Sequence, residues 1–265
     1  MINLIKADLF RLKKSKAYKN SVILMGLFII LAMYKTFSGR SISILMANSG
    51  GRLYGFLIGD IIGNENYLTL FRSSLGLISL ITFLILFIVG DLVITRYENG
   101  EIKNTVAYGY VRYKIYLANM ISILLGVVFI TISSVIISMS ILTIFFKPES
   151  PISIMEFSTI IKVMSVAILI LGSMVSVYVF LATAIRSKAL IATIGIFSIT
   201  AIPIILLAKN LIETIGFKVP IVMLMNICSE PATANLLATF SLNSIILILV
   251  SNILGCIIFK NQEFK

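Results

Sequence analysis

The sequence contains no histidine and no tryptophan, and only two cysteines, Cys228 and Cys256, among its 265 residues. Without histidine there is no Ser-His-Asp triad, no imidazole metal ligand and no histidine proton relay. Two cysteines so far apart are too few for a zinc cluster, and we expect both to be free thiols. Because tryptophan is absent, any aromatic belt at a membrane surface must be built from tyrosine.

Charged residues are also scarce, and acidic ones are the scarcest. Only 12% of the residues are charged, against roughly 25% in soluble domains, and 11 Asp and Glu stand against 22 Lys and Arg. Hydrophobic residues make up 59% of the chain. A soluble domain cannot bury that much apolar surface, and a disordered chain does not contain it. Lipid must therefore surround most of the protein.

Six continuous apolar stretches are long enough to cross a bilayer as helices, since about 20 residues span its hydrocarbon core. They are residues 21–37, 75–95, 116–146, 158–185, 189–208 and 243–259. Barrel strands would instead alternate in polarity over about ten residues. We therefore predict an all-α integral membrane protein. Residues 1–20 are expected to form an amphipathic connecting helix, and residues 21–265 a single six-helix transmembrane domain.

Basic residues predict the orientation of these spans, because loops on the cytoplasmic side are enriched in Lys and Arg. Of the 22 Lys and Arg residues, 14 fall in the N-terminal segment, the loop after span two, the link after span four and the tail. These segments are short, so their density of positive charge is high. We expect a multi-pass protein of the cell (plasma) membrane with both termini in the cytoplasm.

The first 17 residues are predicted to form an interfacial helix that lies on the membrane surface. Its apolar face comprises Met1, Ile2, Ile5, Leu9 and Leu12, and its basic face comprises Lys6, Arg11, Lys13 and Lys14. The alternative interpretation is an ordinary basic flank before the first span.

The connections on the opposite side include two short apolar stretches. In the long loop of residues 38–74, the segment 53–62 is too short to span and is expected at the interface. The segment Val219–Cys228, bounded by Pro220 and Pro231, favours a re-entrant or interfacial hairpin before span six. A loosely structured loop is the alternative there.

The loop between spans two and three is the most informative segment. Gly100 can end the helix that leaves the membrane, and Glu101–Tyr108 can then form a short surface helix. Such a helix would place Ile102, Val106 and either Tyr108 or Gly109 inward, with Lys103 and Asn104 outward. It could transmit a displacement by a soluble partner to spans two and three. A plain connector anchored by tyrosine and lysine is the alternative.

Two charged residues fall within or near the predicted spans. Asp91 lies about one turn from the inner end of span two, and Lys162 lies one turn into span four. Charges at the membrane centre are costly, so such residues are usually functional or extend to the interface. We expect both side chains to reach the interface. Alternatively, Asp91 pairs with a base such as Arg96 and holds the loop in place.

Two motifs carry a resemblance to a known family. The loop reads Glu98-x-Gly100-x-Ile102-Lys103-Asn104 and then Gly109-x-x-Arg112-x-x-Ile115-Tyr116, and the N-terminus reads Leu4-Ile5-Lys6-Ala7-Asp8-Leu9-Phe10-Arg11-Leu12. Both segments and the six-span layout resemble type 2 ATP-binding-cassette (ABC) permeases. The half-size permeases of Gram-positive bacteria that export or expel lantibiotics, bacitracin and peptide toxins are the most similar. That family often has Thr after the loop glycine, where this chain has Glu101.

The resemblance implies that a coupling helix between spans two and three docks onto a cytoplasmic ABC ATPase subunit, which binds ATP and Mg. The partner-binding residues it implies are Glu98, Gly100, Glu101, Ile102, Lys103 and Asn104, with a second cytoplasmic contact at Arg186, Ser187 and Lys188. A second permease copy, identical or related, is expected because six spans enclose too little space for a peptide pathway. No cofactor, metal or nucleic acid is expected on this chain.

The expected function is therefore ATP-driven export of amphipathic or antimicrobial peptides, or self-immunity against them, by a permease that is not itself an enzyme. An ion- or proton-coupled secondary transporter is the alternative, but it would have acids near the midplane and usually an internal repeat. An intramembrane enzyme is disfavoured because histidine is absent and Asp91 is the lone acid of the spans.

Overall fold

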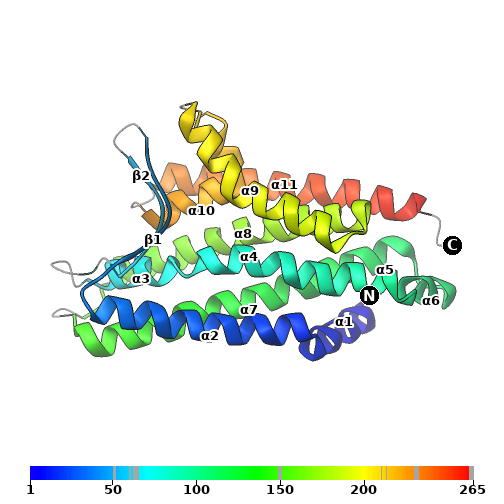
Figure 1. The fold of residues 1–265 in the computed structure, drawn as a ribbon, viewed down its shortest axis with the longest axis horizontal. Coiled ribbons are helices and arrows are strands. Elements are labelled where there is room, and N and C mark those ends of the chain that lie inside the picture. Colours follow the sequence, from blue (N-terminus) through cyan, green and yellow to red (C-terminus); the bar gives the residue numbers. More distant parts are fainter. Residues whose placement is uncertain are drawn as a thin grey trace.

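The computed structural model describes residues 1–49, 52–59, 61, 66–148, 151–209, 211–212, 214–229 and 233–262. The helices are α1 (Ile2–Lys14), α2 (Lys16–Phe37), α3 (Tyr67–Leu75), α4 (Ile78–Val89), α5 (Thr95–Glu98), α6 (Glu101–Ala107), α7 (Arg112–Phe146), α8 (Ile154–Ile185), α9 (Lys188–Ala208), α10 (Pro220–Ser229) and α11 (Ala234–Asn261). The strands are β1 (Ile42–Ser49) and β2 (Arg52–Ile58). Apart from α9, the long helices run along one common axis (Figure 1).

Six apolar helical stretches of the described chain are long enough to cross a membrane, which confirms the prediction of a multi-pass membrane protein. Five are single helices, and the other is the continuous run Tyr67–Glu98, which joins α3, α4, a π-helical turn at Gly90–Ile94 and α5. The helices extend past the predicted bounds of the spans. At the start of α11, for example, the Thr233 hydroxyl accepts a hydrogen bond from the Leu236 N–H at 3.4 Å, so the helix begins well before residue 243.

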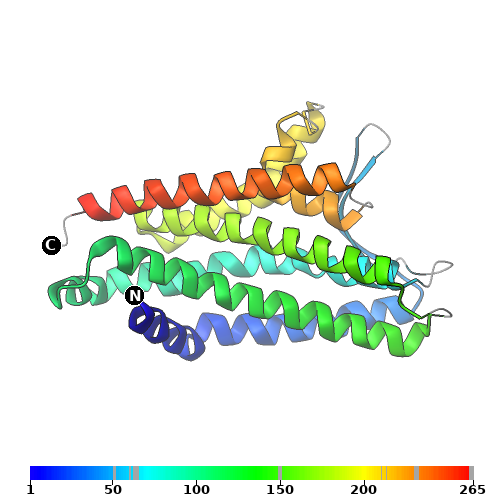
Figure 2. The ribbon, with the colours of Figure 1, turned by 180° about the vertical axis from the view of Figure 1, so that it is seen from behind.

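The run Tyr67–Glu98 and α8 form the centre of the bundle, and 78% and 67% of their most apolar windows are buried inside it. Helices α2, α9 and α11 lie at the periphery and expose broad apolar faces, as expected for surfaces in contact with lipid. From behind, α11, α8, α7 and α2 lie side by side (Figure 2). Helix α9 instead diverges from the bundle toward one end (Figure 1).

Small residues allow close approach between several helices. A Cβ atom on Gly255 of α11 would overlap the ring and hydroxyl of Tyr116 on α7. A Cβ on Gly126 of α7 would lie 2.7 Å from a methyl carbon of Leu12 on α1. The short first helix is thus packed directly onto a membrane-spanning helix.

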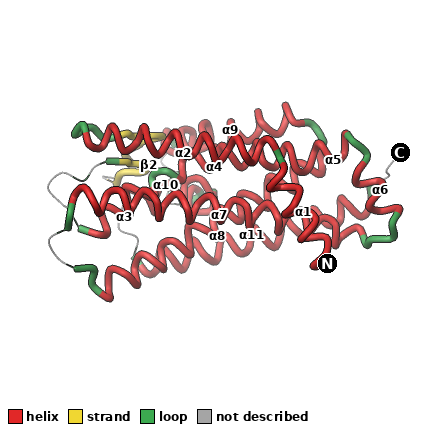
Figure 3. The backbone as a smooth tube through the Cα atoms, turned by 90° about the horizontal axis from the view of Figure 1, so that it is seen from below, coloured by secondary structure: helices red, strands yellow, loops and turns green. Residues whose placement is uncertain are grey.

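The end of the bundle opposite α6 differs from the all-α prediction, because β1 and β2 pair there as antiparallel strands. Ile42 lies opposite Ile58 and Ile44 lies opposite Phe56, with an irregularity after Ile44. Leu45 adopts a left-handed backbone conformation there, with φ of 52°. The two strands lie beside α3 and α10, at the end of the molecule opposite α6 (Figure 3).

The hairpin explains the short apolar segment of residues 53–62, which the sequence placed at the membrane interface. Tyr54, Phe56 and Ile58 are fully buried, whereas Leu53 is 46% exposed. This alternation is typical of a strand with one buried face. It is hidden in the sequence because the intervening residues Leu53 and Leu57 are also apolar.

A short apolar helix, α10, precedes α11 and packs beneath the hairpin. Its residues from Ile221 to Cys228 are buried, and the Ser229 hydroxyl donates a hydrogen bond to the Leu53 carbonyl at 2.5 Å. Ten residues are too few to cross a bilayer. The re-entrant or interfacial hairpin therefore stays a prediction, and Pro231, its predicted boundary, lies outside the described residues.

Candidate functional site

One end of the bundle, called here the basic end, gathers most of the sequence features singled out above. It comprises α1, α5, α6, the first turn of α7, the link between α8 and α9, and the end of α11, which all lie together (Figure 1). The described residues of these segments, with Lys188 at the start of α9, include 11 of the 22 Lys and Arg residues. The hairpin and α10 lie at the other end.

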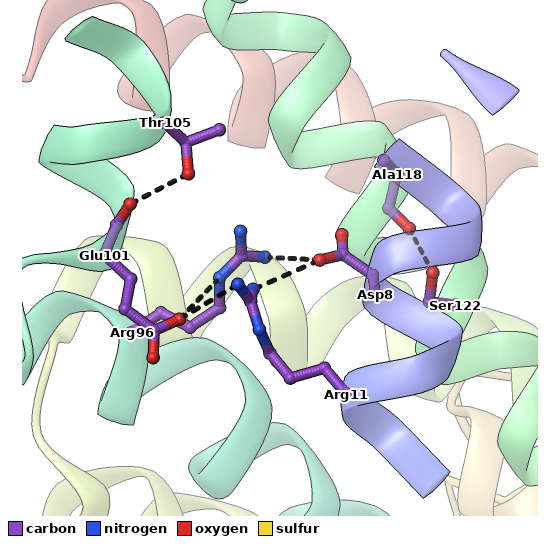
Figure 4. Close-up of polar contacts among 7 residues, drawn as sticks. All are labelled: Asp8, Arg11, Arg96, Glu101, Thr105, Ala118 and Ser122. Atoms are coloured by element: carbon purple, nitrogen blue, oxygen red, sulfur yellow. Dashed lines mark hydrogen bonds and ion pairs between the residues drawn. The ribbon is translucent and has the colours of Figure 1, made fainter. Parts of the chain in front are cut away.

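Four charged side chains form a cluster at the basic end, called here the charge cluster: Asp8, Arg11, Arg96 and Glu101 (Figure 4). Arg96 Nη1 and Arg11 Nη1 lie 3.2 and 3.3 Å from Asp8 Oδ1. Arg11 Nη2 and Arg96 Nε lie 3.2 and 3.9 Å from Glu101 Oε2. The two bases and two acids therefore alternate around a closed ring that joins α1, α5 and α6.

The charge cluster has a buried side and an exposed side. Asp8 is 6% exposed and Arg96 4% exposed, whereas the side chains of Arg11 and Glu101 are 41% and 38% exposed. Burial raises the pKa of Asp8, and the positive charges of Arg96 and Arg11 oppose that rise. The ion pairs on the buried side therefore matter most for packing, because a buried charge is costly once its partner is lost.

One face of helix α6 packs against the bundle, and the opposite face is exposed. Gly100, with φ of 68°, supplies the left-handed turn between α5 and α6. Ile102 is 2% exposed and anchors the helix inward, while Lys103 and Asn104 are exposed. The Ile102 side chain therefore holds α6 in place, and a partner can reach Lys103 and Asn104 instead.

The second predicted contact region adjoins the first. Lys188 Nζ donates to Glu98 Oε2 at 2.7 Å, which links α9 to α5. The Arg186 guanidinium lies 5.1 Å from the centre of the Tyr97 ring, a distance typical of a cation–π contact. Ser187 is the N-cap residue of α9. Glu98 and Lys188 thus face each other in this conformation.

The end of α11 is tied to the same region by contacts that the sequence did not suggest. The Tyr97 hydroxyl donates to Gln262 Oε1 at 3.0 Å, and Gln262 Nε2 donates to the Thr183 carbonyl at 2.7 Å. Arg112 Nη1 donates to the carbonyls of Lys260 and Gln262 at 2.6 and 2.8 Å. No local spacing signals such contacts, because their partners are far apart along the chain.

Helix α1 packs differently from the predicted surface helix. Its buried residues are Leu4, Asp8 and Leu12, which lie one turn apart and face the bundle. Of the predicted apolar face, Leu12 is buried, Ile5 and Leu9 are half-buried, and Met1 and Ile2 are exposed. Of the predicted basic face, Lys6 and Lys13 are exposed and Arg11 joins the charge cluster. The row Leu4, Asp8 and Leu12 thus faces the bundle, and Asp8 is buried there beside its partner Arg96.

Asp91 does not pair with Arg96, which was the alternative to a side chain that reaches the interface. The Ser15 hydroxyl, at the junction of α1 and α2, donates a hydrogen bond of 2.5 Å to Asp91 Oδ2. Arg96 pairs with Asp8 instead. Asp91 therefore holds the α1–α2 junction against the π-helical turn Gly90–Ile94.

The chemical groups of the basic end are suited to holding and transmitting position. In the described part of the chain, no three His, Cys, Asp or Glu side chains converge as a metal site requires. The charges of the cluster contact one another and connect three helices. Ion pairs therefore join α6 to α1 and to the second span.

Comparison of the sequence with family models gives no match, and comparison with curated proteins gives none either. The interpretation of the basic end therefore depends on its geometry and on the sequence motifs.

Proposed function

We propose that this chain is the membrane-spanning permease subunit of an ATP-driven ABC transporter, which moves amphipathic or antimicrobial peptides out of the cell or the membrane. ATP and Mg would be bound by a separate cytoplasmic ATPase. The observation that carries the proposal is the placement of α6, a surface helix between two apolar spans that is anchored to both α1 and the second span. The motifs of this loop and of α1 resemble those of type 2 ABC permeases.

The exposed face of α6 supplies the surface that an ATPase would contact. Lys103 and Asn104 point away from the bundle, and Tyr108, just after the helix, is 84% exposed. One cationic, one amide and one aromatic group suit a groove with acidic and apolar walls. The neighbouring Lys188 lies on the same end of the molecule and would form the edge of that contact.

The charge cluster gives the proposal a mechanical step. A displacement of α6 moves Glu101, which is in contact with Arg11 on α1 and with Arg96 on the second span. The π-helical turn at Gly90–Ile94 ends two residues before Arg96 in the same span. Such turns often mark functional positions in helices. We assign this turn as the point at which the second span bends when α6 is displaced.

A second permease copy would complete the pathway. Helices α2, α9 and α11 expose apolar faces, with 33%, 28% and 22% of their most apolar windows buried. These faces can meet lipid or another copy. With both termini and α6 in the cytoplasm, two copies would present two α6 helices to two ATPases.

The proposal is tested by searching the neighbouring reading frames for an ABC ATPase and reconstituting the chain with it in vesicles. Reversing the charge of Lys103 (Lys103→Glu) should weaken ATPase binding by about tenfold, since like charges facing each other across an interface are costly. Peptide-stimulated ATP hydrolysis should fall with it. ATPase binding is measured by flotation of the vesicles, and hydrolysis by phosphate release.

The control is Lys162→Glu, which reverses an exposed charge in the N-terminal part of α8, away from the basic end. It should leave ATPase binding and stimulation unchanged. Equal effects of the two variants, or binding that survives in Lys103→Glu, would show that α6 is not the docking surface.

A further inference from the structure

A groove of about 800 Å³ opens at the basic end between the α6–α7 connection and the end of α11. Its walls are mostly apolar and aromatic, with Val106, Tyr110, Tyr113 and Ile257 among the lining residues. Tyr110, Tyr113 and Ile257 are 44%, 47% and 51% exposed, so the groove is open to its surroundings. No part of the proposed coupling step uses it.

The rim of the groove is cationic. Lys260 and Arg112 line it, and Lys114 Nζ lies 6.0 Å from the centre of the Tyr113 ring. The described residues that line the groove include no acid. Arg112 is fixed by its bonds to the carbonyls at the end of α11, whereas Lys260 is exposed there. An occupant of this rim is therefore expected to carry negative charge.

The apolar lining of the groove continues along an exposed apolar face of α11, which is suited to contact with lipid acyl chains. On α11, Leu249, Ile253 and Ile257 follow one another at helical spacing and are 57%, 59% and 51% exposed. The groove therefore joins a membrane-facing apolar strip to a cationic rim with two tyrosines. Tyrosine is suited to such a boundary because its ring is apolar and its hydroxyl is polar.

We infer that this groove binds an anionic phospholipid, with the headgroup phosphate at Lys260 and the acyl chains along α11. Basic pockets between transmembrane helices are known to hold anionic headgroups in this manner. A second copy of the chain is a poorer occupant, because a two-fold contact would bring the same cationic rims together. The inference requires only that the chain lies in a membrane, and it does not depend on an ATPase.

The absence of tryptophan allows a sharp test, because one introduced indole is the only one in the chain. The full chain with a Tyr113→Trp reporter would be reconstituted in phosphatidylcholine vesicles. Quenching of its indole fluorescence would then be compared between small amounts of brominated phosphatidylglycerol and brominated phosphatidylcholine. We expect the phosphatidylglycerol to bind preferentially. Adding Lys260→Gln should lower that preference about fivefold, the size expected for one basic residue at an anionic lipid surface.

Two controls separate a site from general attraction to the basic end. A reporter at Leu190→Trp, an exposed position on α9 beside the paired Lys188, should show no preference. Lys103→Gln removes a base from the same end outside the lining of the groove and should leave the preference at Tyr113→Trp unchanged. Equal quenching by both lipids, or equal effects of Lys260→Gln and Lys103→Gln, would overturn the inference. Cross-linking that places a second copy of the chain over the groove, where it would exclude lipid, would also overturn the inference.

Discussion

At the scale of single residues, the contact between Asp8 and Arg96 is the least expected feature of the molecule. A carboxylate and a guanidinium that are 6% and 4% exposed face each other at the basic end of a highly apolar bundle. Such a pair adds little stability compared with two apolar residues of similar size, but losing one partner leaves a buried charge. Its value here is positional, because it fixes which face of α1 packs against the bundle.

Removing Arg96 should therefore destabilise the protein in a pH-dependent manner. In Arg96→Met, Asp8 loses the nearer of its two opposing positive charges, so its pKa, which burial already raises above 3.8, rises further. A carboxyl group whose pKa is higher in the folded state contributes stability at low pH and loses it as the pH rises through that pKa. We expect a loss of roughly 3 kcal/mol at pH 8 and a smaller loss at pH 5.

Thermal unfolding in detergent, followed by circular dichroism at the two pH values, checks this prediction. The double variant Asp8→Asn/Arg96→Met should regain stability at pH 8 and lose the pH dependence, because no unpaired charge remains. Lys13→Gln, which removes an exposed charge from α1, is the matched control and should have little effect. An equal loss at both pH values would contradict the assignment to Asp8.

At the scale of elements, the packing of helices depends on a few glycines with crowded surroundings. Gly255 lets α11 approach Tyr116 on α7 at the basic end, where Tyr116 and Phe259 also lie with ring centres 6.2 Å apart. Gly26 on α2 is different, since no described atom outside its own helix backbone lies within 4 Å of where its Cβ would be. The two glycines allow the same substitution to be compared in a crowded and an open place.

Gly255→Ala should destabilise the bundle by about 1–3 kcal/mol, the usual cost of inserting a methyl group into a filled space. Gly26→Ala should cause no loss, because its methyl group meets open surroundings and alanine favours helix. The measurement is the unfolding midpoint of both variants in the same detergent. A midpoint of Gly255→Ala that equals that of Gly26→Ala would show that α11 does not pack on α7 through this contact.

The sequence predicted elements well where the signal is local, and poorly where it depends on distant partners. Long apolar runs identified the six spans because a helix satisfies its own backbone within each run. The strand β2 was missed because Leu53 and Leu57 conceal the alternation of its buried residues. The burial of Asp8 on α1 could not be predicted from local sequence, because Asp8 is polar and only the position of Arg96 in the fold explains it.

At the scale of the whole molecule, the two ends of the bundle are chemically distinct. The basic end holds α1, α6 and the end of α11, and the opposite end holds the hairpin and α10 (Figure 1). An even number of spans places the beginning and end of the chain at the same end, and the crowding of Lys and Arg there predicts that this end faces the cytoplasm. The proposed ATPase contact requires this orientation, whereas the proposed lipid groove requires only that the chain lies in a membrane.

Single cysteines near the two ends should therefore react from opposite sides of the membrane. In a background with Cys228→Ala and Cys256→Ser, Lys103→Cys on α6 and Ile154→Cys at the start of α8 are both exposed, and Ile154 is 89% exposed. A membrane-impermeant maleimide added to intact cells should label Ile154→Cys and leave Lys103→Cys unlabelled. After permeabilisation both should react, because both positions are at the surface. Labelling of Lys103→Cys in intact cells would reverse the topology, and an ATPase in the cytoplasm could then not reach α6.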